Sequence, residues 1–333
     1  MSNTVDKPVI LLPRATTVIG PMVVGSWINW MLMGTLVVQF YRYQCNFPKD
    51  KPAVKVLVYT VVTLDIIQTV VTSHLTWFFA IANWHDPTVL FRTTWSANML
   101  PLFAGLISGI VQIFYAWRIF KLSKARWMSC LAGLISLIAT SQATAAIVAS
   151  IMIQFNPTQE RLLQLHPVFS YWLAGSFTVD ILITAAMLQI LFNARAISAL
   201  SRTGNLVDTL ISNAIQTGAI TVVCAGVDLA LFVAYTSSNF HFVPAYILGK
   251  LYSNSLLATL NTRETLRNAP TYNTSDSFCK DLQTRPENKT TTTSTMTQSK
   301  STGHSWPIKK VKDDESDSTE AQVAGKSGFG VAL

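Results

Sequence analysis

The segment from Phe242 to Leu260 constrains the fold most, because it is long enough to cross a bilayer yet carries polar side chains at depths inside the hydrocarbon. These side chains include Lys250, Ser253 and Asn254. In lipid each polar group needs a partner, so a helix that carries them faces lipid on one side only. Several other helices are therefore expected to surround it.

The rest of the chain supplies such helices, since hydrophobic runs of spanning length recur along it. Of the 333 residues, 50% are hydrophobic and 13% are charged, against about 25% charged residues in soluble domains. The runs cover 18–40, 54–79, 99–120, 127–155, 168–192, 211–235 and 242–260. We therefore predict an all-α membrane protein built as a bundle of seven transmembrane helices.

The distribution of Lys and Arg predicts the orientation of this bundle. The first, third and fifth loops carry ten such residues (four, four and two), whereas the second, fourth and sixth carry only Arg92 and Arg161. The N-terminus, residues 1–17, is expected outside or in a lumen, and the C-terminus in the cytosol. The net charge of +8 does not indicate nucleic acid, because the basic residues lie between apolar blocks and in the tail. Plasma membrane and internal membranes fit equally.

The composition changes abruptly after Leu260. Residues 261–333 are rich in Ser, Thr, Lys and Asp and have too few apolar residues to form a core. We predict a disordered cytosolic tail, with an acidic, serine-containing stretch over residues 313–318 that suits a kinase or another cytosolic partner. A solvated tail without a special role is the alternative.

Four ionisable side chains lie within the predicted spans: Asp65, Asp180, Asp228 and Lys250. A charge at mid-bilayer costs about 2.5–3.5 kcal/mol even on insertion scales, so these groups should point into the bundle. Asp228 and Lys250 lie at similar depths on helices joined by a short loop, which predicts that they pair, with Asp65 or Asp180 as the alternative partner of Lys250. Together with Asn254 and Ser253 they form the candidate intramembrane polar network. A purely structural ion pair is the competing interpretation.

No cofactor, metal or catalytic group is expected. A lysine in the last span resembles the retinal-linking lysine of rhodopsins, but a lone intramembrane lysine is more typical of an ion pair. The histidines His74, His85, His166 and His241 include no pair at i,i+4 spacing. No nucleophile is paired with a base by spacing, so an enzyme is not expected.

Small residues predict where helices approach closely. They are Gly20, Gly25 and Gly34 in the first run, Gly105 and Gly109 in the third, and Ala139, Ala143, Ala145 and Ala146 in the fourth.

Several motifs resemble one family. They include Gly25, Asn29, Gly34, Gln39 and Tyr43 in the first run, Asp65 in the second, and Val179-Asp180-Ile181-Leu182-Ile183 with Asn193-Ala194-Arg195 in the fifth. The most specific motif is Gly249-Lys250-Leu251-Tyr252-Ser253-Asn254-Ser255, continuing to Arg263. Over residues 15–267 the chain resembles the seven-span membrane proteins of mushroom-forming fungi known as domain of unknown function 6534. This resemblance implies an integral membrane protein and no established activity.

Two classes of function remain. The first is a receptor-like or sensory protein, which fits seven spans, an outer N-terminus and a Ser/Thr-rich tail, although the usual receptor motifs are missing. The second is a small-solute or proton pathway, or a lipid-binding scaffold, that uses the interior acids and Lys250. Besides the lipid bilayer, the expected partners are a small apolar ligand and a cytosolic partner or kinase at the tail.

Overall fold

The structure is a computed structural model that describes residues 15–83, 94–123, 125–198, 204–235 and 239–267. These residues form seven α-helices and one π-helical turn, with no strand among them. In chain order they are α1 (Ala15–Asn46), α2 (Pro52–Trp77), η1 (Phe78–Ala82), α3 (Trp95–Leu122), α4 (Arg126–Phe155), α5 (Gln159–Ser198), α6 (Gly204–Ala234) and α7 (Phe242–Arg267).

The helices match the predicted hydrophobic runs and extend beyond most of them. α7 continues past Leu260 to Arg267, so the first seven residues assigned to the tail, 261–267, are helical. Residues 1–14 and 268–333, which hold most of the predicted N-terminal segment and tail, lie outside the described residues.

Six helices, α1 to α6, are long and apolar enough to cross a membrane. The chain is therefore a multi-pass integral membrane protein. α7 is long enough but less apolar than the other six, because its sequence includes Lys250, Asn254, Arg263 and Glu264. A seventh crossing by α7 stays a prediction.

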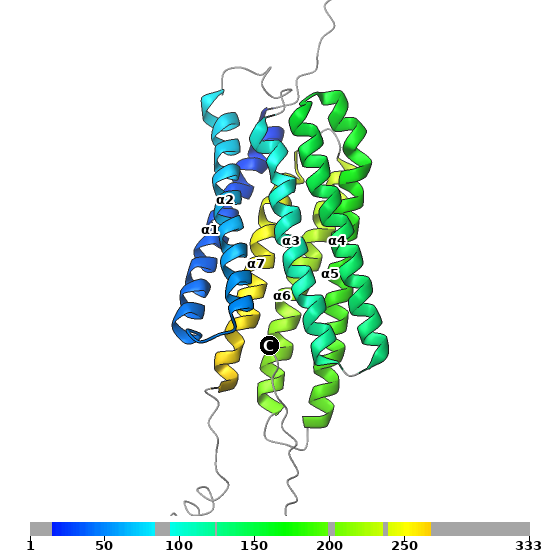
Figure 1. Cartoon of the computed structure of the whole chain (residues 1–333). Helices are drawn as coiled ribbons and strands as arrows, with labels where there is room; N and C mark the ends of the chain where they lie inside the picture. Colours follow the sequence, from blue (N-terminus) through cyan, green and yellow to red (C-terminus); the bar gives the residue numbers. More distant parts are fainter. Residues whose placement is uncertain (1–14, 84–93, 124, 199–203, 236–238, 268–333) are drawn as a thin grey trace, which may run out of the picture. The chain divides into compact units, whose positions relative to one another are not determined.

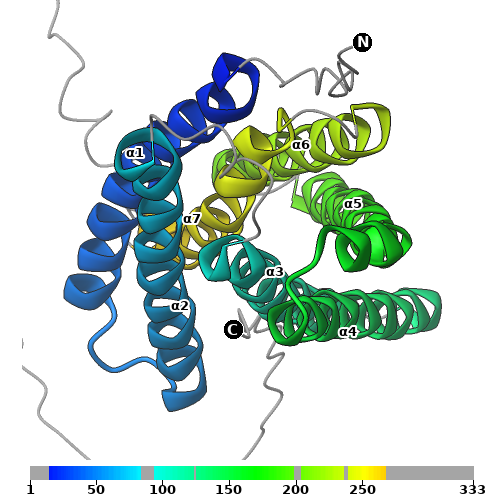
Figure 2. The same ribbon diagram turned by 90° about the horizontal axis from the view of Figure 1, so that it is seen from above.

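α7 lies in the middle of the helical domain. It contacts α1, α2, α3 and α6, and the view along the bundle shows it between the α1–α2 pair and the other helices (Figures 1 and 2). This position explains how a helix with so many polar residues is accommodated, since its neighbours cover it on most sides. Its apolar residues Leu256, Leu257 and Leu260 are fully buried in a core shared with α1, α2 and α3.

Small residues bring α3 and α4 together, as predicted. A methyl group added at Gly105 would lie 2.7 Å from the Cβ of Ala146, and one added at Gly109 would lie 2.9 Å from the Cβ of Ala143. Both distances are shorter than van der Waals contact, so larger residues would push the helices apart. Gly25 serves α1 and α7 in the same way, because a methyl group added there would lie 3.1 Å from the ring of Tyr246.

Gly20 and Gly34 do not follow this prediction. No described atom of another element lies within 4 Å of a methyl group added at either position. These glycines lie on the exposed side of α1, which also carries large apolar residues such as Trp27, Trp30 and Val38. Spacing alone did not separate the packed face of α1 from its exposed face.

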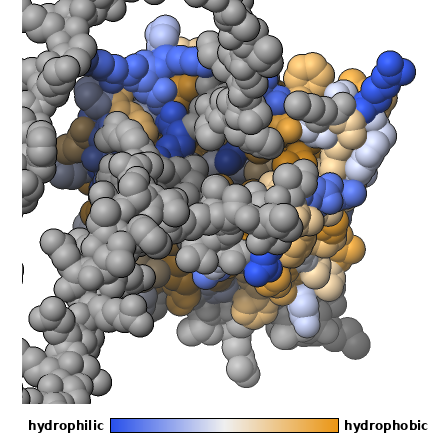
Figure 3. Space-filling view, turned by 90° about the horizontal axis from the view of Figure 1, so that it is seen from below, coloured by the Kyte–Doolittle hydropathy of each residue, from blue (hydrophilic) through white to orange (hydrophobic). Residues whose placement is uncertain are grey.

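One end of the bundle carries the turns after α1 and α3 together with the last residues of α7, and we call it the basic end (Figure 1). Figure 3 looks onto this end, where strongly hydrophilic side chains lie beside apolar ones. Here Arg263 of α7 donates to Asp50 Oδ2 at 2.8 Å, and Tyr43 of α1 donates to the same oxygen at 3.0 Å. The contacts fasten the end of α7 to the α1–α2 turn.

The electrostatics of Asp50 follow from these contacts. Burial raises the pKa of this carboxyl, but the Arg263 guanidinium and the backbone N–H of Lys51 donate to it and outweigh burial, so that its pKa lies below the ordinary value. Asp50 is therefore ionised at neutral pH.

Candidate functional site

Lys250 forms a buried ion pair with Asp65. Its Nζ lies 2.7 Å from Asp65 Oδ1 and also donates to the backbone oxygen of Asp65 at 2.9 Å and to Gln68 Oε1 at 3.4 Å. The side chains of Lys250 and Asp65 are both 0% exposed. The ammonium has three acceptors for its three protons, so this contact is closed and its charge is compensated.

The expected pairing of Lys250 with Asp228 is therefore wrong, and the alternative partner Asp65 takes its place. The prediction rested on position along the helix axis, and this position does not fix the direction in which a side chain leaves its helix. Lys250 points toward α2 and not toward α6.

A glycine makes room for this ion pair. A methyl group on Gly249 would lie 2.5 Å from Gln68 Oε1, so the missing side chain allows Gln68 to lie across α7 beside Lys250. On α2, Asp65, Gln68 and Thr72 are buried at helical spacing. The polar face of α2 was not singled out from the sequence beyond Asp65.

Asp228 lies in a different part of the bundle. It is 1% exposed, and its Oδ1 has no hydrogen-bond partner among the described residues. His241 Nδ1, in the turn before α7, lies 3.9 Å from the same oxygen. His241 packs edge-on against Phe232, which in turn stacks on His166 with ring centroids 4.6 Å apart.

Asn254 lies apart from the carboxylates, whereas Ser253 interacts with the Asp65 side chain. Asn254 joins α7 to α1: its Oδ1 accepts from Thr35 at 2.8 Å and from Gln39 at 3.0 Å, and its Nδ2 donates to the Leu32 oxygen at 3.2 Å. Ser253 donates to the Gly249 carbonyl of its own helix. Of the six residues predicted as one network, Lys250, Asp65 and Ser253 lie together, whereas Asp228, Asp180 and Asn254 make separate contacts around α7.

Asp180 on α5 is the centre of a second buried polar cluster. Its Oδ2 accepts from the Tyr252 hydroxyl at 2.6 Å and its Oδ1 from Gln112 Nε2 at 2.9 Å. Ser176 lies 3.0 Å from the same hydroxyl, and Gln142 of α4 donates to Gln112 at 2.5 Å. No Lys or Arg of the described residues forms a salt bridge with Asp180, in contrast to Asp65.

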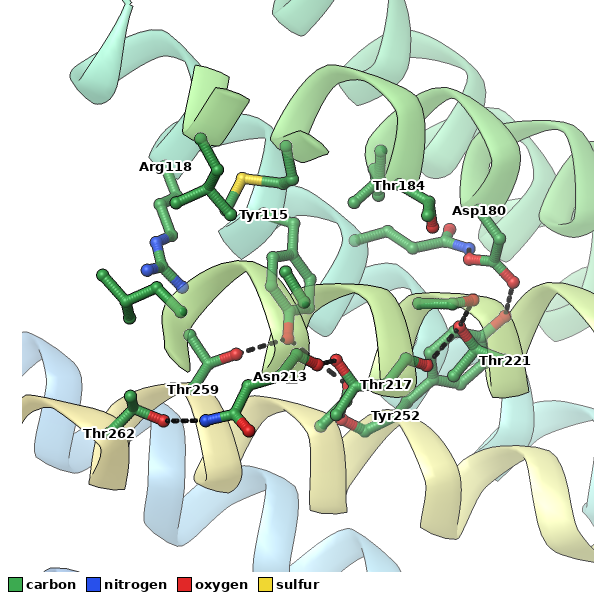
Figure 4. A pocket seen from close by; sticks show the side chains of 18 residues that line it. Tyr115, Arg118, Asp180, Thr184, Asn213, Thr217, Thr221, Tyr252, Thr259 and Thr262 are labelled. Carbon is green, nitrogen blue, oxygen red and sulfur yellow. Dashed lines mark hydrogen bonds between the residues drawn. The ribbon is translucent and has the colours of Figure 1, made fainter. Parts of the chain in front are cut away.

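A cavity of about 60 Å³ opens next to Asp180, between α3, α5, α6 and α7 (Figure 4). A cavity of this size holds several water molecules or a small organic molecule. The lining residues come from these four helices and are Gln112, Tyr115, Arg118, Asp180, Ile183, Thr184, Met187, Leu191, Leu210, Asn213, Ala214, Thr217, Gly218, Thr221, Tyr252, Ser255, Thr259 and Thr262.

Hydroxyl and amide groups line one side of the cavity. Tyr115 of α3 lies 3.1 Å from Thr259 Oγ1, and Asn213 of α6 donates to Thr262 Oγ1 at 3.2 Å. Figure 4 shows Asp180 and Tyr252 at one end of the row and Thr262 at the other. Of the predicted site residues, only Asp180 lines this cavity.

The lining residues were missed, although a signal for them is present. On α7 the residues Tyr252, Ser255, Thr259 and Thr262 recur at every third or fourth position, which places them on one face. On α6 the polar residues Asn213, Thr217 and Thr221 recur at every fourth position.

Arg118, near the end of α3, lines the cavity on the side closest to the basic end of the bundle. Its Nε is buried without a hydrogen-bond partner, and none of the described carboxylates forms a salt bridge with it. In Figure 4 the guanidinium points toward the side on which Thr259 and Thr262 lie. From the sequence, Arg118 counted only as one of the basic residues that set the orientation.

The potential metal ligands are scattered. Among the described residues, no three His, Cys, Asp or Glu side chains come together in a way that could hold a metal ion. His74 bonds Ser96 through Nδ1 at 3.1 Å and packs on Trp95. His85 lies outside the described residues.

Comparison with known proteins gives one match. Residues 176–265 match the model of a family described as "Family of unknown function (DUF6534)". The predicted family resemblance is confirmed over these residues. The searches of curated proteins and of solved structures found no match. The matched residues 176–265 include every residue of the cavity wall except Gln112, Tyr115 and Arg118 of α3.

Proposed function

We propose that this protein is a receptor-like or sensory membrane protein with seven spans and an outer N-terminus, and that its cavity binds a small polar molecule. The observation that carries the proposal is the cavity itself, in which four helices meet around Asp180 and a row of hydroxyl groups. Concave sites with a few convergent polar groups are where small molecules bind. The mixed wall favours a polar ligand over the apolar one expected from the sequence.

α7 provides a physical route from such a ligand to the rest of the bundle. Tyr252 lines the cavity, whereas Lys250, two residues earlier, holds α2 through Asp65. Further along, Arg263 holds the α1–α2 turn through Asp50. A ligand that contacts α7 more favourably in one arrangement of the helices than in another shifts the population toward that arrangement.

Thermal unfolding of the purified protein in nanodiscs tests whether the cavity binds a ligand. Glycerol, lactate and inorganic phosphate serve as probes, and Ala214→Phe fills the cavity from α6. Val223→Phe is the matched control, because Val223 is on the same helix and 65% exposed. We expect at least one probe to raise the unfolding temperature of the wild type and Val223→Phe but not of Ala214→Phe. Equal shifts in both variants would contradict binding in the cavity.

A distance measurement tests the sensory part. Spin labels at Lys121→Cys on α3 and Gln216→Cys on α6, in a background without the native cysteines, report the separation of two cavity walls. A receptor-like protein changes this distance distribution when the stabilising probe is added, whereas a binding scaffold keeps it unchanged.

A small-solute or proton pathway is the second candidate. The observation in its favour is the hydroxyl-lined cavity that ends at the buried carboxyl of Asp180. Interior carboxyl groups recur in proton relays. Proton-coupled uptake in vesicles that is abolished by Asp180→Asn would favour this candidate over the receptor-like one.

A further inference from the structure

We infer that the ligand of the cavity is a small monocarboxylate, with its charged end on Arg118 and its body along the hydroxyl row of α6 and α7. This inference rests on the proposed binding function of the same cavity. It adds the chemical class of the ligand and a residue that recognises it.

Arg118 supplies an uncompensated positive charge to the cavity. Three of the described carboxylates already form salt bridges with other basic residues: Asp50 with Arg263, Asp65 with Lys250, and Glu264 with Arg42. Arg118 has no such contact among the described residues, and its buried Nε lacks an acceptor. A buried donor without an acceptor is costly, so an anion in the cavity would satisfy a group that the described protein atoms leave unsatisfied.

The charges around the cavity favour a single negative charge on the ligand. Arg118 is the only Lys or Arg among the lining residues, and Asp180 at the other end is acidic. A phosphate with two negative charges would keep one charge unpaired in a buried place. A carboxylate matches the planar fork of a guanidinium, which donates two parallel hydrogen bonds to its two oxygens.

The volume and the wall limit the body of the ligand. A cavity of about 60 Å³ admits a molecule of a few heavy atoms. Between Arg118 and Asp180 such a molecule would lie beside Thr217, Thr221 and Thr259, which line the cavity. A short acid that carries a hydroxyl group therefore fits better than an unsubstituted one.

Direct binding measured by saturation-transfer NMR on the full chain in nanodiscs tests the inference. The probes are lactate, acetate, glycerol and inorganic phosphate. We expect lactate to bind more tightly than acetate and phosphate, and we expect Arg118→Gln to weaken lactate binding by about tenfold or more, because a hydrogen bond to a charged group is lost. Arg118→Lys keeps the charge but not the fork, so its loss should be smaller.

Arg126→Gln is the matched control. Arg126 begins α4 near the same end, is exposed, and does not line the cavity. Its substitution removes the same charge from the protein surface and should leave lactate binding unchanged. Equal weakening by Arg118→Gln and Arg126→Gln would mean a general electrostatic effect and would overturn the inference.

The remaining outcomes separate this inference from the proposed function. If glycerol or phosphate binds, Ala214→Phe blocks it, and lactate does not bind, the cavity is a ligand site but the monocarboxylate inference fails. If no probe binds the wild type at millimolar concentration, both fail. If Arg118→Gln does not fold, the comparison of Arg118→Lys with the wild type decides, since an unchanged lactate affinity would contradict recognition by the guanidinium fork.

Discussion

The two buried carboxyl groups next to α7, Asp65 and Asp180, have opposite surroundings. Asp65 receives an ammonium at 2.7 Å, is 0% exposed, and does not line the cavity. Asp180 receives a phenol and an amide, has no salt bridge with a described residue, and lines the cavity. The charge of the first group is compensated by an ammonium, although its Oδ2 has no hydrogen-bond partner among the described residues, whereas the second group is adjacent to space that another molecule can enter.

This difference arises because α7 uses two of its sides for different purposes. Lys250 and Tyr252 are two residues apart, so their side chains leave the helix about 200° apart. One side therefore meets α2 through Lys250, and the other meets α5 through Tyr252 and α3 through Ser255 and Thr259. We therefore expect Lys250 to serve the packing of the bundle, and we place the candidate ligand site on the side of Tyr252.

The largest expected effect is the loss of one partner of the closed pair. Lys250→Met and Asp65→Asn each disrupt a buried ion pair and should lower the free energy of unfolding by about 3–5 kcal/mol. The double variant Lys250→Met/Asp65→Asn removes both charges and should be more stable than the worse single variant. Reversible unfolding in mixed detergent micelles gives the three values.

Asp228→Asn is the control for this cycle. Asp228 has no contact with Lys250 among the described hydrogen bonds and salt bridges. Its effect should add to that of Lys250→Met within the error of the measurement. Strong coupling of Asp228 with Lys250, together with additive effects at Asp65, would reverse our assignment of the closed pair.

The Arg263–Asp50 pair, whose side chains are 13% and 11% exposed, should behave as an intermediate case. Asp50→Asn should cost about 2 kcal/mol at neutral pH, since hydrogen bonds to a charged group are lost. The contacts hold the pKa of Asp50 below its ordinary value, so their contribution is present above that value, about 3.9, and disappears as pH falls through the lower folded-state pKa.

Unfolding measured as a function of pH checks this sign. The wild type should lose its advantage over Asp50→Asn only below about pH 4. A difference that stays constant down to the most acidic condition, or that grows on acidification, would show that the charge of Asp50 is not what stabilises the turn.

Asp180→Asn should lower the free energy of unfolding much less than Asp65→Asn does, because Asp180 has no cationic partner among the described residues. Asp180→Asn keeps a polar group that bonds both Tyr252 and Gln112, and no cation is left unpaired. The cost should be about 1 kcal/mol or less, within the range of a neutral hydrogen bond. A loss as large as that of Asp65→Asn, measured in the same micelles, would mean that Asp180 compensates a charge in the fold.

Much of the fold was predictable because the bilayer imposes a length on each hydrophobic run. The contact of Gly105 and Gly109 with α4 was also predictable, since residues four apart share one face of a helix and small ones permit close approach. Gly20 and Gly34 show the limit of this argument, because the same pattern occurs on an unpacked face of α1.

The site was predictable only in part. Hydrophobic length fixes how deep Lys250 lies, but only the packed helices decide whether it meets Asp65 or Asp228. The hydroxyl row was readable as a periodic pattern, yet threonines in helices commonly donate to their own backbone, as Thr217 and Thr262 also do here. The pattern therefore does not distinguish a cavity wall from an ordinary helix until α3, α5 and α6 are in place.

The smallest expected effect concerns the Arg42–Glu264 contact at the basic end. Its N–O distance is 3.4 Å and the side chains are 59% and 23% exposed. Exposed pairs of this kind contribute about 0.5 kcal/mol or less, because water and salt screen them. Arg42→Ala should therefore change the free energy of unfolding far less than Lys250→Met, and added salt should remove the difference. A large, salt-independent loss in Arg42→Ala would mean that burial does not rank the ion pairs compared above, Lys250–Asp65, Arg263–Asp50 and Arg42–Glu264. The contrast between the two sides of α7 would then lose its energetic basis.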